Sequence, residues 1–258
     1  MREKFDKMIE IDQEELILEK MAEDFNQPEI PLKIKKIKLL ETVGLPISKM
    51  DFVKRENFDD LASVISERFK RQDCPLIIRF ACVPDKFSMP FLYLEKEASE
   101  EEKNKIVEGI RSLIENDSNI KYLILQEATP VEKAKDKISG RISFEKGKMS
   151  PIQEVLEIYK GARSTGVLNN VDVNDPNYQR FVKKAGEFMK PAKTLDADSS
   201  IEEGDIREIY NFLSMYREKI ETIIDIITKS KNKLVNDMAI SLEFSYRDGK
   251  IVFSDIDF

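Results

Sequence analysis

The stretch from Met238 to Phe258, MAISLEFSYRDGKIVFSDIDF, constrains the fold of this chain more than any other. Two runs of strand composition flank the tripeptide Arg-Asp-Gly that ends at Gly249, which predicts a β-hairpin. If Gly249 is the left-handed residue of a three-residue loop, the loop fixes the register of both strands. That register places Glu243, Asp255 and Asp257 on one face, whereas a two-residue Asp-Gly turn would place Glu243 opposite both aspartates.

Three carboxylates on one face repel one another and are costly to desolvate. A hard cation such as Mg2+ among Glu243, Asp255 and Asp257 would relieve both costs, so the hairpin predicts a magnesium site. The alternative is a solvated polar face on an edge strand, which is common in antiparallel sheets.

Composition excludes several kinds of chemistry. The 258 residues include no His, which rules out His-based catalysis and His-ligated zinc. Cys74 and Cys82 are too few for a disulfide framework and indicate a reduced, cytoplasmic protein. No apolar stretch approaches the roughly 20 residues of a membrane span, so we expect a soluble protein without a membrane partner. The net charge of -7 is spread along the chain, which argues against a nucleic-acid partner.

Hydrophobic periodicity predicts the α+β class. The chain of 258 residues is long enough for two lobes. Helices are expected at residues 3–25, between Pro31 and Gly44, at 56–69, from Ser99 onward, at 180–190 and at 206–234. Strands are expected at residues 49–53, after Pro75, at 91–94, at 120–127, from Ile138 onward, at 154–159 and in the hairpin. Ser99 and Glu102 form a capping-box pattern at the start of one of these helices.

Arg79 interrupts an apolar strand, LIIRFACV, that otherwise looks fully buried. A buried strand carries an Arg mainly when a carboxylate or another anion meets it. An internal salt bridge and a phosphate contact explain this residue equally well.

In this order the motifs resemble the ATP-grasp superfamily, from about Lys33 to the last residue. LKIKKIKLLETVGLPISKMDFV resembles the family's lysine-bearing helix and turn, PLIIRFACV its second basic strand, and YLILQEA the strand that holds adenine. ISGRISFE and EVLEIYKGARSTGVLNN are nearest in pattern to the nucleotide-binding domain of phosphoenolpyruvate synthase and pyruvate phosphate dikinase. LEFSYRDGKIVFSDID resembles the closing hairpin of the superfamily.

The resemblance implies two α/β lobes with a nucleotide cleft between them. Residues 1–30 would be a helical lead-in, residues 31–126 the N-terminal lobe, and residues 127–258 the C-terminal lobe with the hairpin.

The resemblance also implies roles for individual residues. It assigns Lys33 and Arg79 to the ATP phosphates, Gln126, Glu127 and Ala128 to adenine, Glu243, Asp255 and Asp257 to magnesium, and Arg141 to the transition state. Lys35, Lys36 and Lys38 compete with Lys33 for the phosphate contact. Asp257 stands where the family usually has Asn or Arg.

Two functions from different classes follow from this resemblance. One is an ATP- and Mg2+-dependent carboxylate ligase that forms an acylphosphate and passes it to a small-molecule acceptor. The other is a non-catalytic nucleotide-binding or assembly module that kept the fold. PDKFSMP replaces the usual glycine-rich phosphate loop without a single Gly, which favours the second function. The sequence reveals neither the acceptor nor the oligomeric state.

Overall fold

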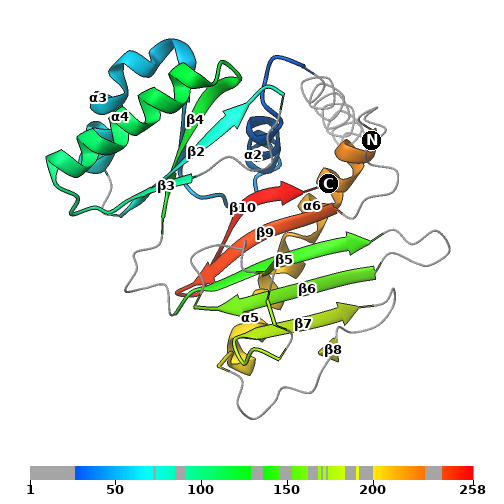
Figure 1. Ribbon diagram of the computed structural model, residues 1–258. Coiled ribbons are helices and arrows are strands. Elements are labelled where there is room, and N and C mark those ends of the chain that lie inside the picture. Colours follow the sequence, from blue (N-terminus) through cyan, green and yellow to red (C-terminus); the bar gives the residue numbers. More distant parts are fainter. Residues whose placement is uncertain are drawn as a thin grey trace, which may run out of the picture.

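Two antiparallel sheets form the framework of the molecule (Figure 1). The computed structural model describes residues 27–71, 74–84, 91–128, 136–145, 153–161, 168–169, 171–172, 174–183, 190–191, 200–229 and 240–257. The two antiparallel sheets with their helices agree with the predicted α+β class. The expected helix at residues 3–25 lies outside the described residues.

The first sheet has four strands in the order β1-β4-β2-β3. Its strands are β1 (Met50–Lys54), β2 (Leu76–Cys82), β3 (Phe91–Leu94) and β4 (Ile120–Glu127). A 3-10 helix, η1 (Arg55–Asp60), leads into α3 (Leu61–Arg71), which packs with α4 (Glu100–Asn116) on one face of this sheet. The predicted capping box is present at the start of α4, where Ser99 and Glu102 satisfy each other's backbone N–H groups.

The second sheet has six strands in the order β10-β9-β5-β6-β7-β8. Its strands are β5 (Ile138–Glu145), β6 (Gln153–Lys160), β7 (Tyr178–Lys183), β8 (Lys190–Pro191), β9 (Ile240–Arg247) and β10 (Lys250–Asp257). Helices α5 (Glu203–Met215) and α6 (Arg217–Lys229) bury the apolar side chains of one face. The alternate residues of β9 and β5 therefore form a polar face on the other side.

Gly140 in β5 lets an aromatic ring lie directly on the strand. Gly140 is paired with Phe244 of β9, and a Cβ built on Gly140 would stand 2.2 Å from that ring. Real Cβ contacts are never that short, so the packing of fully buried Phe244 requires Gly at this position.

Two expectations about helices were wrong. Residues 180–190 are not helical where they are described, because Tyr178–Lys183 pairs with β6 as strand β7. Phe181 and Tyr178 are buried by this pairing, a tertiary effect that local periodicity does not contain. The long helix expected at 206–234 is divided at Tyr216 into α5 and α6.

Helix α2 (Leu32–Thr42) lies between the two sheets (Figure 1). Ile34 and Ile37 pack against the face of the four-stranded sheet that α3 and α4 leave open, whereas Leu39 and Leu40 join the core of the six-stranded sheet. As predicted, the helix ends just before Gly44, which has a left-handed φ of 73°. The division into lobes at residues 126 and 127 stays a prediction, because α2 packs against both sheets.

None of the described helices is long and apolar enough to cross a membrane.

Candidate functional site

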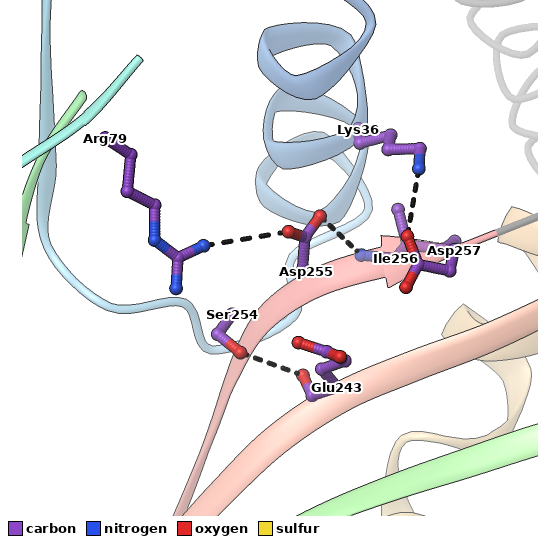
Figure 2. A network of polar contacts seen from close by, with 7 residues as sticks. All are labelled: Lys36, Arg79, Glu243, Ser254, Asp255, Ile256 and Asp257. Atoms are coloured by element: carbon purple, nitrogen blue, oxygen red, sulfur yellow. Dashed lines mark hydrogen bonds and ion pairs between the residues drawn. The ribbon is translucent and has the colours of Figure 1, made fainter. Parts of the chain in front are cut away.

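The two sheets meet through a charged pair. Arg79 of β2 lies on the face of its strand away from α3 and α4, and its Nη1 is 3.7 Å from Oδ2 of Asp255 in β10 (Figure 2). The side chains are 19% and 17% exposed. A distance of 3.7 Å is an ion pair but too long for a hydrogen bond.

The hairpin that carries Asp255 differs from the predicted one in its turn. Lys250 pairs with Arg247, so the loop has two residues, Asp248 and Gly249, with φ of 53° and 67°. The prediction of a three-residue loop was therefore wrong. Asp248, like Gly249, adopts the left-handed conformation that the two-residue turn needs.

A β-bulge restores the expected facing of two carboxylates. The register shifts between Phe253 and Asp255, so Asp255 stands directly opposite Glu243. Asp257 stands opposite Ser241. Because residues 241 and 243 alternate with buried Leu242, all three acidic residues occupy positions on the polar face.

Helix α2 brings lysines to the same place, as Figure 2 shows for one of them. Lys36 is buried, and its Nζ lies 3.1 Å from Oδ1 of Asp257. Lys33 is close enough for its charge to act on Asp255. Of the two other lysines considered, Lys35 donates to the carbonyl of Gln27, and Lys38 is exposed.

The Asp255 carboxyl is in an environment that works against its ionisation. Burial raises its pKa, and the positive charges of Lys33 and Arg79 oppose that rise. The negative charge of Asp257 adds to it. A cation brought to this carboxylate would therefore be bound with a favourable electrostatic contribution.

Arg141 is placed beside the carboxylates but is already engaged. It pairs in register with Glu243 of β9 on one side and with Glu157 of β6 on the other. Its Nη2 and Nε donate to Glu157 at 2.8 and 3.1 Å, and its Nη1 donates to Asn169 at 2.9 Å. Tyr178 also donates to Glu157, at 2.7 Å. The structure thus holds Arg141 rigidly on the polar face.

Gln126 has a buried side-chain oxygen that accepts no hydrogen bond from the described residues. It is 5% exposed and, within the described residues, its Oε1 has no hydrogen-bond partner. Its neighbour in β2 is Ile77, which places it on the same face as Arg79. The backbone N–H groups of Glu127 and Ala128 are not available in the same way, because they donate to the carbonyls of Lys49 and Pro75.

The described residues contain no group of three or more Asp, Glu or Cys side chains that could hold a metal ion. The acidic face is therefore a pair, Glu243 and Asp255, with Asp257 turned to Lys36. Two carboxylates fit a cation that also takes phosphate oxygens as ligands.

Sequence reasoning missed Lys137, which precedes β5. It is only 8% exposed and stands on the polar face, two residues before Ser139 and four before Arg141. Period-two alternation of residues 137, 139 and 141 could have identified it.

Comparisons with known proteins give a loose structural likeness. No family model matches the chain, and no curated protein matches it. It is similar to D-alanine–D-alanine ligase from Helicobacter pylori, with 11% identity and a TM-score of 0.46 over 87% of this chain and 53% of that one. D-cycloserine synthetase has 11% identity and a TM-score of 0.46, over 88% of this chain and 62% of that one. Carboxyaminoimidazole ribonucleotide synthase from Aspergillus clavatus, complexed with ATP, has 9% identity and a TM-score of 0.44, over 88% of this chain and 44% of that one.

The chain spans less than two thirds of the length of each of these three enzymes. At TM-scores below 0.5, the likeness assigns neither a family nor an activity to this chain.

Proposed function

We propose that this protein binds Mg-ATP between its two sheets, as the resemblance to ATP-grasp proteins implies. The observation that carries the proposal is the pair of Arg79 and Asp255. It joins a mostly buried cation of one sheet to a mostly buried carboxylate of the other, at 3.7 Å. Buried ion pairs cost desolvation free energy and stabilise a fold weakly, so a ligand that uses both charges is a good reason for this one.

The acidic residues of the hairpin suit Mg2+, and the basic residues that face them suit the phosphates. Asp255 and Glu243, paired across β10 and β9, would hold Mg2+ together with phosphate oxygens. Arg79 and Lys33 would neutralise the phosphate charge. Mg2+, when bound, would stabilise the negative charge of the phosphates during transfer of the terminal phosphoryl group.

Gln126 supports the adenine end of the proposal. Its buried Oε1 lacks a hydrogen-bond donor among the described residues and faces the same side of the sheet as Arg79. The exocyclic amino group of adenine is a donor that would satisfy it. An unmade buried hydrogen bond costs about 1–3 kcal/mol, which binding would recover.

As an enzyme, the protein would act as a carboxylate ligase. A substrate carboxylate oxygen would attack the terminal phosphorus of ATP, ADP would leave, and an acylphosphate would form. An acceptor amine would then attack the acyl carbon and release phosphate and a proton. Arg141, fixed by Glu157 on the polar face, would stabilise the developing negative charge. The likeness in pattern to dikinases stays a prediction.

A non-catalytic nucleotide-binding or assembly module is the second candidate. Its support is that Lys36 and Arg79 already meet carboxylates, at 3.1 and 3.7 Å. The Arg79–Asp255 pair would then replace the ligand in holding the two sheets together, and the Lys36–Asp257 pair would hold α2 to β10. Mg2+ separates the candidates, because turnover requires the metal and a scaffold does not.

Isothermal titration calorimetry tests the proposal directly. We expect ADP and ATP to bind, and to bind more tightly with Mg2+, because Glu243 and Asp255 then gain a cation. Glu243→Gln should remove most of the gain from Mg2+. Absence of binding at about 1 mM nucleotide, which corresponds to a binding free energy weaker than roughly -4 kcal/mol, would reject the proposal.

Gln126→Met should separate adenine recognition from folding. The substitution removes the unsatisfied amide at nearly constant volume, so we expect the melting temperature to stay level or rise. We expect ATP affinity to fall about tenfold, the equivalent of one lost hydrogen bond of about 1.4 kcal/mol. Gln179→Met in β7, away from β4, is the matched control and should leave affinity unchanged. Equal ATP affinity in the wild type and Gln126→Met would remove Gln126 from the site.

A further inference from the structure

Lys36 and Asp257 form an ion pair that joins α2 to the end of β10. The Nζ of Lys36 lies 3.1 Å from Oδ1 of Asp257, which is hydrogen-bond distance. The two side chains differ in exposure, at 10% for Lys36 and 61% for Asp257. A buried ammonium group depends on an anionic partner, whereas a mostly exposed carboxylate is hydrated by water. Loss of the pair would therefore cost Lys36 more than Asp257.

The two aspartates of β10 are turned to different cations, as Figure 2 shows. Asp257 meets Lys36 of α2, whereas Asp255 meets Arg79 of β2 at 3.7 Å. Asp255 and Asp257 are alternate residues on the polar face of one strand, about 7 Å apart along it. The oxygen ligands of one Mg2+ lie only about 3 Å from one another. To share an ion with Asp255, Asp257 would have to turn away from Lys36.

Such a turn would be unfavourable for the lysine and gain little for the aspartate. Removing a carboxylate from a buried charge is strongly destabilising, whereas a carboxylate in water gains only modestly from one more cation. A metal ion at Asp257 would also be repelled by the ammonium group of Lys36. Both effects favour Lys36 over a metal ion as the partner of Asp257.

We propose that Lys36 takes the place of a metal ion at Asp257, so that Asp257 is not a ligand of the magnesium site. The hairpin would then bind one divalent cation through Glu243 and Asp255. This inference rests on the proposed function and defines which of the three carboxylates bind the metal. Lys36 is a positioning residue in this arrangement, because it acts by engaging Asp257 and does not contact the ion.

Mn2+ titrations of the nucleotide-free full chain, followed by electron paramagnetic resonance, test the inference in a double-variant cycle. Mn2+ prefers the same oxygen ligands as Mg2+. We expect Asp257→Asn, which keeps an oxygen that can accept from Lys36, to change the Mn2+ affinity of the wild type less than about threefold. Lys36→Met should bind Mn2+ about tenfold more tightly, because Asp257 becomes a third ligand. In the Lys36→Met background, Asp257→Asn should remove most of that gain.

Lys38→Met is the matched control for the loss of one positive charge from α2. Lys38 belongs to the same helix and is exposed. We expect this variant to change the Mn2+ affinity less than about threefold, because exposed charges are screened. The melting temperature of Lys36→Met should stay within about 4 °C of the wild type, because Met fills the buried space and the carboxylate of Asp257 is exposed.

Other results would overturn the inference and separate it from the function on which it rests. If Asp257→Asn weakens Mn2+ binding to the wild type about tenfold, Asp257 is a metal ligand and the magnesium site stands without the role of Lys36. If the tighter binding of Lys36→Met persists after Asp257→Asn, the charge of Lys36 acts on the ion directly. If no variant binds Mn2+, the inference and the proposed magnesium site are both wrong, and calorimetry with ADP alone decides whether nucleotide binding stands.

Discussion

Arg79→Ala should both abolish nucleotide binding and lower the stability of the free protein. Asp255 is 17% exposed, and the substitution leaves this carboxylate without its partner at 3.7 Å. Removing one member of a buried pair typically costs about 3–5 kcal/mol, and we expect the lower end because Asp255 can take up a proton. Thermal unfolding should then occur about 6–12 °C lower.

A double variant distinguishes the two effects. Arg79→Met with Asp255→Asn removes both charges and should recover most of the lost stability, because no uncompensated charge remains. It should not recover nucleotide binding, which requires the charges themselves. A single Arg79→Ala variant with unchanged ATP affinity and a sharply lowered melting temperature would show that the pair is structural only.

The second large effect is expected at Gly140. A Cβ in Gly140→Ala would stand 2.2, 2.6 and 2.8 Å from three atoms of the Phe244 ring. Phe244 is fully buried, so the ring can move only by displacing the core under α5 and α6. We expect a loss of about 3 kcal/mol or more in the free energy of unfolding, measured by urea denaturation.

Gly109→Ala is the matched control for this substitution. Gly109 lies inside α4, and nothing stands within 4 Å of its Cβ position. In a helix interior, Ala is more favourable than Gly by about 0.5–1 kcal/mol, so this variant should be more stable than the wild type. Combining Gly140→Ala with Phe244→Leu, which shortens the ring side chain, should recover part of the loss. If both glycine variants have similar stability, the ring does not require Gly140.

Most elements could be predicted from the sequence because their signals are local. The capping box of α4 and the glycine stop of α2 use residues a few positions apart. The turn of the hairpin was predicted less well, because the sequence allows two loop lengths around Gly249. The bulge that follows lies beside a tertiary contact: Phe253 N–H donates to Pro46, and its carbonyl accepts from Ser48. No local pattern contains that contact.

The candidate site was predictable in its charges and less so in their partners. Arg79 could be selected because an Arg interrupts an apolar strand, but whether it meets an acid depends on the packing of two sheets. Gln126 was selected by resemblance, and its unmade hydrogen bond emerges only when β4 is buried between β1 and β2. The alternation of residues 137, 139 and 141 places Lys137 on the polar face, but its burial cannot be read from that alternation.

Helix α2 also bears on how the chain folds during synthesis. It packs against both sheets, and Lys36 contacts Asp257 across 221 residues of sequence. The ribosome therefore synthesises α2 long before β10. Until β10 is made, Ile37 and Leu40, which are buried in the folded protein, remain exposed. Contacts of such high sequence separation slow folding, so α2 is the segment that we expect a chaperone to protect in the nascent chain.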